Sequence, residues 1–104
     1  MSVLMNFAMF PTDKGSSVSE FVSRVVKMIS ESGFDYKLTS MGTIVETETL
    51  SQALEIVDKS YSLLENDSQR VYSTVSFDIQ TNKPLGRITG KIKSVEDKIF
   101  KNKS

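Results

Sequence analysis

The pattern of apolar and polar residues divides the chain into extended and helical segments. Period-two alternation or a short apolar run predicts a strand, and apolar residues spaced three and four apart predict an amphipathic helix. Between the strands lie two predicted helices, residues 18–32 and 50–66, and a third, weaker helical pattern begins at about Gly86. The predicted strands are residues 3–10, 34–39, 43–48 and 70–81.

The first predicted strand is apolar on both faces, with Asn6 as its only polar break. A strand of this kind is normally buried on both sides. Helices can cover only one face of so small a sheet, so the second face requires a ligand or a partner subunit. An exposed apolar patch of this size marks an interface, and the pattern therefore predicts self-association.

Two sequence signals predict where helices begin. Ser17 with Glu20, and Thr49 with Gln52, have the spacing of a capping box. In such a box each side chain accepts a hydrogen bond from the other residue's backbone N–H, so both helices are expected to begin directly after the capping residue.

The order of the segments, β-α-β-β-α-β followed by a helix, predicts an α+β fold of the ferredoxin-like type. A tight turn at residues 40–42 joins the two middle strands into a hairpin, because Gly42 can take the positive φ that such turns often require. Right-handed crossovers place two helices on one face of an antiparallel sheet. Residues 1–104 are expected to form one domain, with a C-terminal helix and a frayed tail over residues 84–104.

The composition narrows the possible functions. The chain has 13 basic and 13 acidic residues, so its net charge does not favour binding to nucleic acid or to a membrane. It has no cysteine and no histidine, which excludes disulfides, thiolate zinc sites and histidine-based catalytic triads. No leader-like segment or membrane-length apolar run is visible, so a cytoplasmic location is expected.

The remaining polar residues favour binding over catalysis. There is no glycine-rich phosphate loop, and the carboxylates lack the dense spacing of a calcium site. We therefore expect a protein that is not an enzyme, with no catalytic residue, metal site or cofactor. Glu46 and Asp78 are carboxylates on predicted strands, and a carboxylate beside an aromatic such as Phe7 or Tyr72 suits a flat cationic heterocycle.

A series of short segments, spread in order over nearly the whole chain, carries a family resemblance. The most specific is a serine-glycine-aromatic-x-tyrosine step at residues 32–36, which leads into Met-Gly-Thr at residues 41–43. The other matching segments are residues 7–11, 44–46, 70–71 and 78–79. Together they resemble the small thiamine-binding protein superfamily.

The resemblance implies a ferredoxin-like protein that binds thiamine or its hydroxymethylpyrimidine portion without catalysing a reaction. It also implies self-assembly, with sheets packed face to face in dimers and a dimer of dimers as the homotetramer. We expect the ligand site at a subunit junction near the hairpin, since the hairpin tip alone is too shallow to bury a ring. The candidate residues are Phe7 and Met41 for an aromatic and sulfur-containing wall, Ser40 and Thr43 for hydroxyl partners, and Glu46 or Asp78 for a carboxylate acceptor.

Four residues depart from the family pattern. Ser40 stands where the family usually has proline, and Thr47 stands where glycine is common. Tyr61-Ser62 replaces a histidine-glutamate pair in the second helix. The alternative hypothesis is a structural or regulatory homo-oligomer that binds no small ligand, because self-association covers the whole open face of its sheet.

Overall fold

The computed structural model describes residues 1–101 of the 104-residue chain. The predicted frayed tail runs through residues 102–104, which lie outside the described residues. None of the described helices is long and apolar enough to cross a membrane.

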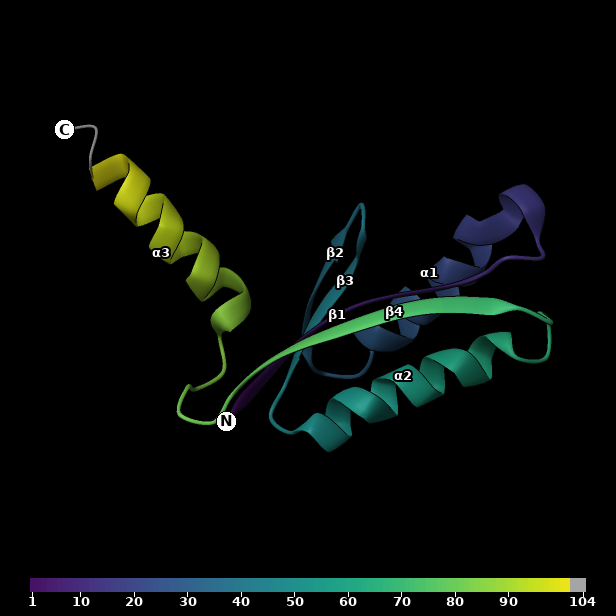
Figure 1. Cartoon of the computed structure of the whole chain (residues 1–104), viewed down its shortest axis with the longest axis horizontal. Helices are drawn as coiled ribbons and strands as arrows, with labels where there is room; N and C mark the ends of the chain where they lie inside the picture. The colour runs from purple at the N-terminus through teal and green to yellow at the C-terminus, as the bar shows by residue number, and fades with distance from the viewer. Residues whose placement is uncertain (102–104) are drawn as a thin grey trace.

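The elements, shown in Figure 1, are β1 (Ser2–Pro11), a 3₁₀ turn (Gly15–Ser17), α1 (Val18–Ser30), β2 (Asp35–Thr39), β3 (Gly42–Thr47), α2 (Leu50–Leu64), β4 (Val71–Gln80) and α3 (Arg87–Lys101).

The strands form one antiparallel sheet in the order β2-β3-β1-β4. β1 lies in the middle and pairs with both neighbours, so that Met5 is opposite Val45 on one side and Phe77 on the other. β2 and β3 form the predicted hairpin, with Thr39 paired to Gly42 across the turn. The two β-α-β units that share this hairpin confirm the predicted α+β, ferredoxin-like class.

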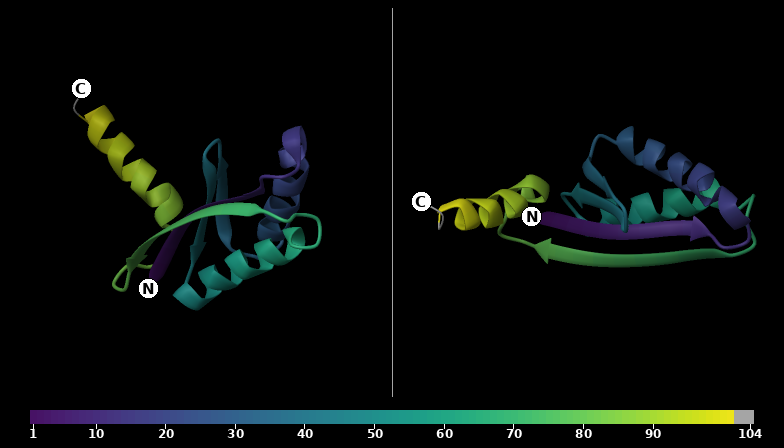
Figure 2. Two further views of the ribbon diagram at one scale, coloured as in Figure 1. Left: turned by 45° about the vertical axis from the view of Figure 1, so that its right-hand side comes forward. Right: turned by 90° about the horizontal axis from the view of Figure 1, so that it is seen from above.

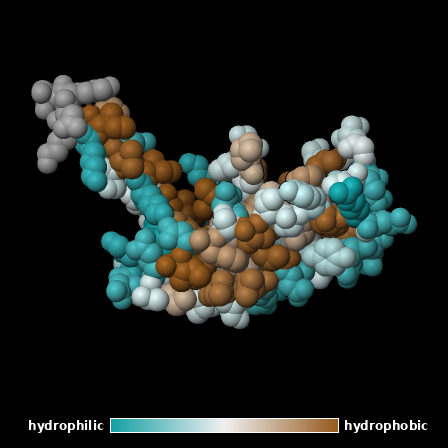
Figure 3. Space-filling model, in the orientation of Figure 1, coloured by the Kyte–Doolittle hydropathy of each residue, from teal (hydrophilic) through white to brown (hydrophobic). Residues whose placement is uncertain are grey.

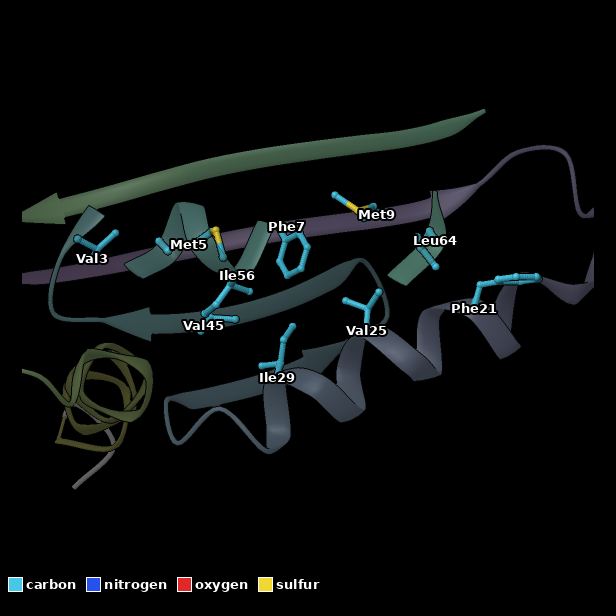
Figure 4. Packing of buried hydrophobic residues seen from close by; sticks show 11 residues of the cluster. Val3, Met5, Phe7, Met9, Phe21, Val25, Ile29, Val45, Ile56 and Leu64 are labelled. Carbon is cyan, nitrogen blue, oxygen red and sulfur yellow. The ribbon is translucent and has the colours of Figure 1, made fainter. Parts of the chain in front are cut away.

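α1 and α2 pack on the same face of the sheet and enclose the hydrophobic core (Figure 2). Because successive residues of a strand point to opposite faces, only alternate residues of β1 enter this core. Figure 4 shows the core side chains between β1, β3 and the two helices. The buried members are Val3, Met5, Phe7, Met9, Phe21, Val25, Ile29, Val45, Ala53, Ile56 and Leu64.

α3 lies on the face of the sheet that α1 and α2 leave uncovered. The expectation that helices cover one face only is therefore wrong. The first turns of α3 lie beside Leu4 and Ile44, two sheet residues that point away from the core. Farther along, α3 extends away from the sheet (Figure 1), and its apolar residues Val95 and Ile99 are 56% and 50% exposed.

The two predicted capping boxes have different outcomes. At α2 the Thr49 hydroxyl accepts the Gln52 N–H at 3.2 Å and the Gln52 side chain accepts the Thr49 N–H at 3.1 Å, which confirms this box. The box predicted for Ser17 and Glu20 is wrong, because a 3₁₀ turn leads into α1 and Ser17 makes no capping hydrogen bond. Ser17 has φ −86° and ψ 16°, whereas Thr49 has the extended backbone that suits a cap.

Gly42 is a position in the hairpin where a side chain would not fit. Its φ is 156°, and a Cβ atom placed on it would lie 3.0 Å from both the Phe7 carbonyl oxygen and the Asn6 side-chain oxygen. We expect Gly42→Ala to lower the free energy of unfolding by about 1–3 kcal/mol, because it forces strain into the β1–β3 pair. Urea denaturation of the two proteins measures the difference.

Gly90→Ala is the control for this substitution. Gly90 lies inside α3, and an added Cβ atom would meet nothing within 4 Å. Alanine should therefore raise the free energy of unfolding by about 0.5–1 kcal/mol, the usual gain over glycine inside a helix. Equal effects of the two substitutions would contradict the close contact at Gly42.

Candidate functional site

A small pocket lies between α1 and the tip of the β2–β3 hairpin, with a volume of about 210 Å³. Four of the six predicted site residues line it, namely Phe7, Ser40, Met41 and Thr43. The strand register explains this, because it pairs Phe7 of β1 with Thr43 directly after the turn. The rest of the lining is Ala8, Met9, Phe10, Val22, Val25, Val26, Leu38, Thr39 and Gly42.

Three hydroxyl groups interrupt this largely apolar lining, and they differ in what they bind. The Thr39 hydroxyl donates to the Gly42 carbonyl at 2.8 Å and accepts the Met41 N–H at 3.2 Å, so it serves to fix the turn. The Ser40 and Thr43 hydroxyls have no hydrogen-bond partner within residues 1–101. The pocket therefore offers two unused hydroxyl groups to a ligand with matching donors or acceptors.

The two wall residues of the predicted site have opposite exposure. Phe7 is 2% exposed and is fixed in the core beneath the pocket. Met41 is 85% exposed at the tip of the hairpin. A methionine side chain has several rotatable bonds and a polarizable sulfur, so Met41 can adapt its position to a ring placed in the pocket.

Glu46 and Asp78, the predicted carboxylate acceptors, do not line this pocket. Both pair with Leu4 of β1, on the face of the sheet that points away from the core. Glu46 is 3% exposed, and its carboxylate accepts hydrogen bonds from the Ser2 hydroxyl and from two backbone N–H groups where α3 begins, at 2.9 and 3.1 Å. The structure thus separates the six predicted residues into two groups on opposite faces of the sheet.

Arg87 joins the two carboxylates, although no sequence pattern singles it out. It is 8% exposed, its Nε donates to the Ser2 hydroxyl at 2.9 Å, and its Nη2 donates to the Ser2 and Asp78 carbonyl oxygens, both at 2.7 Å. Its Nη1 donates at 3.1 Å to the Asp78 carboxylate, which also accepts from Lys91. Together with Glu46, these contacts attach the start of α3 to β1, β3 and β4.

The hydrogen bonds of this cluster lower the pKa of both carboxylates. Burial alone would raise the pKa of Glu46, but the hydrogen bonds from Ser2 and from the start of α3 outweigh it and hold that pKa below its ordinary value. The hydrogen bond from Lys91 is the main cause of the lowered pKa of Asp78. A carboxylate with a lowered folded-state pKa stabilises the fold above its unfolded-state pKa, and this contribution is lost as the pH falls through the folded-state value. We therefore expect the attachment of α3 to weaken in acid, as the pH falls through the folded-state pKa values of these carboxylates.

A second hollow, of about 220 Å³, lies at the other end of the hairpin, where β2 begins and β3 ends. It combines three carboxylates with one aromatic side chain, an environment that favours cations. No group of carboxylates in the described residues is arranged to hold a metal ion. Its lining is Gly33, Phe34, Asp35, Glu46, Glu48 and Leu85.

Comparisons with known proteins agree on one family. The model of the family described as thiamine-binding protein matches residues 5–96. A UPF0045 protein of Methanothermobacter thermautotrophicus is 31% identical over 85 residues, which cover 81% of this chain and 85% of that protein. A UPF0045 protein of Mycobacterium bovis is 26% identical over 78 residues, which cover 75% of this chain and 76% of that protein.

Solved structures show the same fold. The crystal structure of a hypothetical protein of Methanocaldococcus jannaschii matches with a TM-score of 0.81 and 26% identity, over 92% of this chain and 97% of that one. A Thermotoga maritima protein with a provisional assignment to thiamine biosynthesis or salvage matches with a TM-score of 0.75, over 88% of this chain and 99% of that one. Its 19% identity shows the fold alone. Because the family model spans most of the sequence, this chain belongs to the thiamine-binding protein family.

Proposed function

We propose that this chain is a non-catalytic binding protein that holds the hydroxymethylpyrimidine portion of thiamine, or a related pyrimidine, in the pocket beside the hairpin tip. The observation that carries the proposal is the pair of unused hydroxyl groups, on Ser40 and Thr43, in a largely apolar pocket. Membership of the thiamine-binding protein family supports the choice of ligand. The provisional assignment of the Thermotoga maritima protein, which shares the fold, agrees with it.

The size and lining of the pocket favour one ring over the whole of thiamine. Its volume of about 210 Å³ is below the range of about 300–1,000 Å³ that is typical of sites for drug-sized ligands. Leu38 and Met41 supply apolar surface, while Ser40 and Thr43 can exchange hydrogen bonds with the amino group and ring nitrogens of a pyrimidine. The lining contains no charged side chain, so the cationic thiazolium ring would remain outside in water.

Binding without catalysis fits the same lining. A serine or threonine nucleophile requires a neighbouring base, and no ionisable side chain lines this pocket. Self-association is supported by the exposed apolar residues of α3, such as Val95 and Ile99. We expect the functional form to be a homo-oligomer, a tetramer by family resemblance, located in the cytoplasm.

Calorimetric titration with hydroxymethylpyrimidine and with thiamine tests the ligand. We expect the wild-type protein to bind both, because the pyrimidine ring supplies the contacts. Thr43→Val preserves the shape of the side chain and removes its hydroxyl. Since one hydrogen bond contributes about 0.5–1.5 kcal/mol, this variant should bind hydroxymethylpyrimidine about 2- to 12-fold more weakly.

Two control variants locate the site. Ser76→Ala removes an exposed hydroxyl on β4, outside the pocket, and should leave the affinity unchanged. Glu48→Gln alters the second hollow, so weaker binding by this variant, together with normal binding by Thr43→Val, would move the ligand there. No heat from either compound with the wild-type protein would refute the ligand and favour the structural or regulatory homo-oligomer.

A further inference from the structure

β4 forms one edge of the sheet, and its outer side is unpaired within the described residues. On its inner side it pairs with β1 at every position from Val71 to Gln80, without a bulge. In the right-hand view of Figure 2, β4 is the outermost strand and no other element lies beyond it. A row of backbone N–H and C=O groups is therefore open to pairing with another strand.

This edge lacks the features that usually prevent strand pairing. Natural edge strands are protected by short length, lysine, proline or bulges. β4 is 10 residues long and contains neither lysine nor proline. Its one charged residue, Asp78, is already paired with Arg87 and Lys91. A long, regular edge of this kind is either an aggregation hazard or an interface.

An exposed apolar row runs along the same strand. Val75, Phe77 and Ile79 are 39%, 39% and 42% exposed, although they lie on the face that α1 and α2 cover elsewhere. Figure 3 shows an apolar patch over the C-terminal half of β4 and the adjoining start of α2. Burying this row requires a partner that lies alongside the edge of β4.

We propose that the partner is β4 of a second copy of this chain, paired antiparallel about a two-fold axis at Phe77. The apolar row is symmetric about Phe77, so this register sets Phe77 against Phe77 of the partner subunit. It also sets Val75 against Ile79 of the partner subunit, because directly opposite residues of an antiparallel pair lie on one face of the sheet. A two-fold interface needs this kind of self-complementary surface.

The paired edges join the two sheets into one continuous sheet. This interface differs from the face-to-face packing that the family resemblance implies, because it uses backbone hydrogen bonds and the edge rather than the open face. The proposed β4 interface rests on the homo-oligomer part of the proposed function, because it is the surface through which two copies of the chain would associate.

Light scattering during size-exclusion chromatography tests the interface at micromolar concentration. The wild-type protein should have at least the mass of a dimer. Phe77→Lys sets two like charges against each other at the axis and should reduce that mass at least by half. The matched control is Thr74→Lys, an exposed position on the opposite face of β4, which should not fall below the mass of a dimer. Circular dichroism confirms that each variant is folded.

A second pair of substitutions tests the register. Val75→Lys and Ile79→Glu should each weaken the dimer, because each places a charge against an apolar side chain. The double variant sets each lysine against a glutamate of the partner subunit at both ends of the row, and should recover a dimer that the single variants lose. Absence of this recovery in folded proteins would overturn the proposed register.

The outcomes separate this inference from the function on which it rests. A wild-type oligomer whose mass is unaffected by Phe77→Lys would overturn the β4 interface alone. A monomeric wild-type protein would overturn both the interface and the homo-oligomer part of the proposed function. Ligand binding is judged independently, by the calorimetric titration of Thr43→Val.

Discussion

Replacing Arg87 with methionine is expected to lower the free energy of unfolding by about 1–3 kcal/mol, the usual cost of leaving a buried hydrogen-bond acceptor without its donor. Methionine retains an unbranched side chain but donates no hydrogen bonds. The carbonyl oxygens of Ser2 and Asp78 would lose their donor, and the buried Glu46 carboxylate would lose the favourable charge of Arg87. Denaturation followed by circular dichroism measures the change and reports any early loss of α3.

Lys91→Met is the matched control for this variant. Lys91 also forms an ion pair with Asp78, but its side chain is 53% exposed, whereas that of Arg87 is 8% exposed. Exposed ion pairs contribute only about 0–1 kcal/mol, so this substitution should change stability little. If Arg87→Met costs no more than Lys91→Met, the role of Arg87 in attaching α3 to the sheet is contradicted.

Local patterns were sufficient to predict the four strands and three α-helices, but not the 3₁₀ turn at Gly15–Ser17. The alternation in residues 71–80 depends only on side chains two apart, and the helical pattern from about residue 88 persists despite Gly90. The position of α3 could not be predicted in the same way. It depends on hydrogen bonds from Arg87 to Ser2, which is 85 positions away in the sequence. A local pattern of apolar and polar residues cannot predict a contact between residues so far apart.

The predicted site residues fall on opposite faces of the sheet because of their spacing along the strand, which can be read from the sequence. Residues separated by an odd number of positions in one strand point to opposite faces of the sheet. Thr43 and Glu46 are three positions apart on β3, so one side chain enters the pocket while the other meets α3. Phe7 and Thr43 come together because of the β1–β3 register, which joins strands that the hairpin does not connect and which no local pattern specifies.

The same substitution at two methionines is expected to separate the core from the pocket. Met5 is fully buried in the middle of β1, where it lies opposite Val45 and Phe77. Met5→Ala removes side-chain contacts and leaves a cavity, which should lower the free energy of unfolding by about 2–5 kcal/mol.

Met41→Ala should change the free energy of unfolding by no more than about 0.5 kcal/mol, because Met41 is 85% exposed at the hairpin tip. Urea denaturation of the two alanine variants gives the comparison directly. Since the Met41 variant retains a stable fold, any loss of affinity for hydroxymethylpyrimidine that it shows is due to the pocket wall. A loss of stability at Met41→Ala as large as that at Met5→Ala would contradict the exposed position of Met41 and would place its side chain in the packed interior.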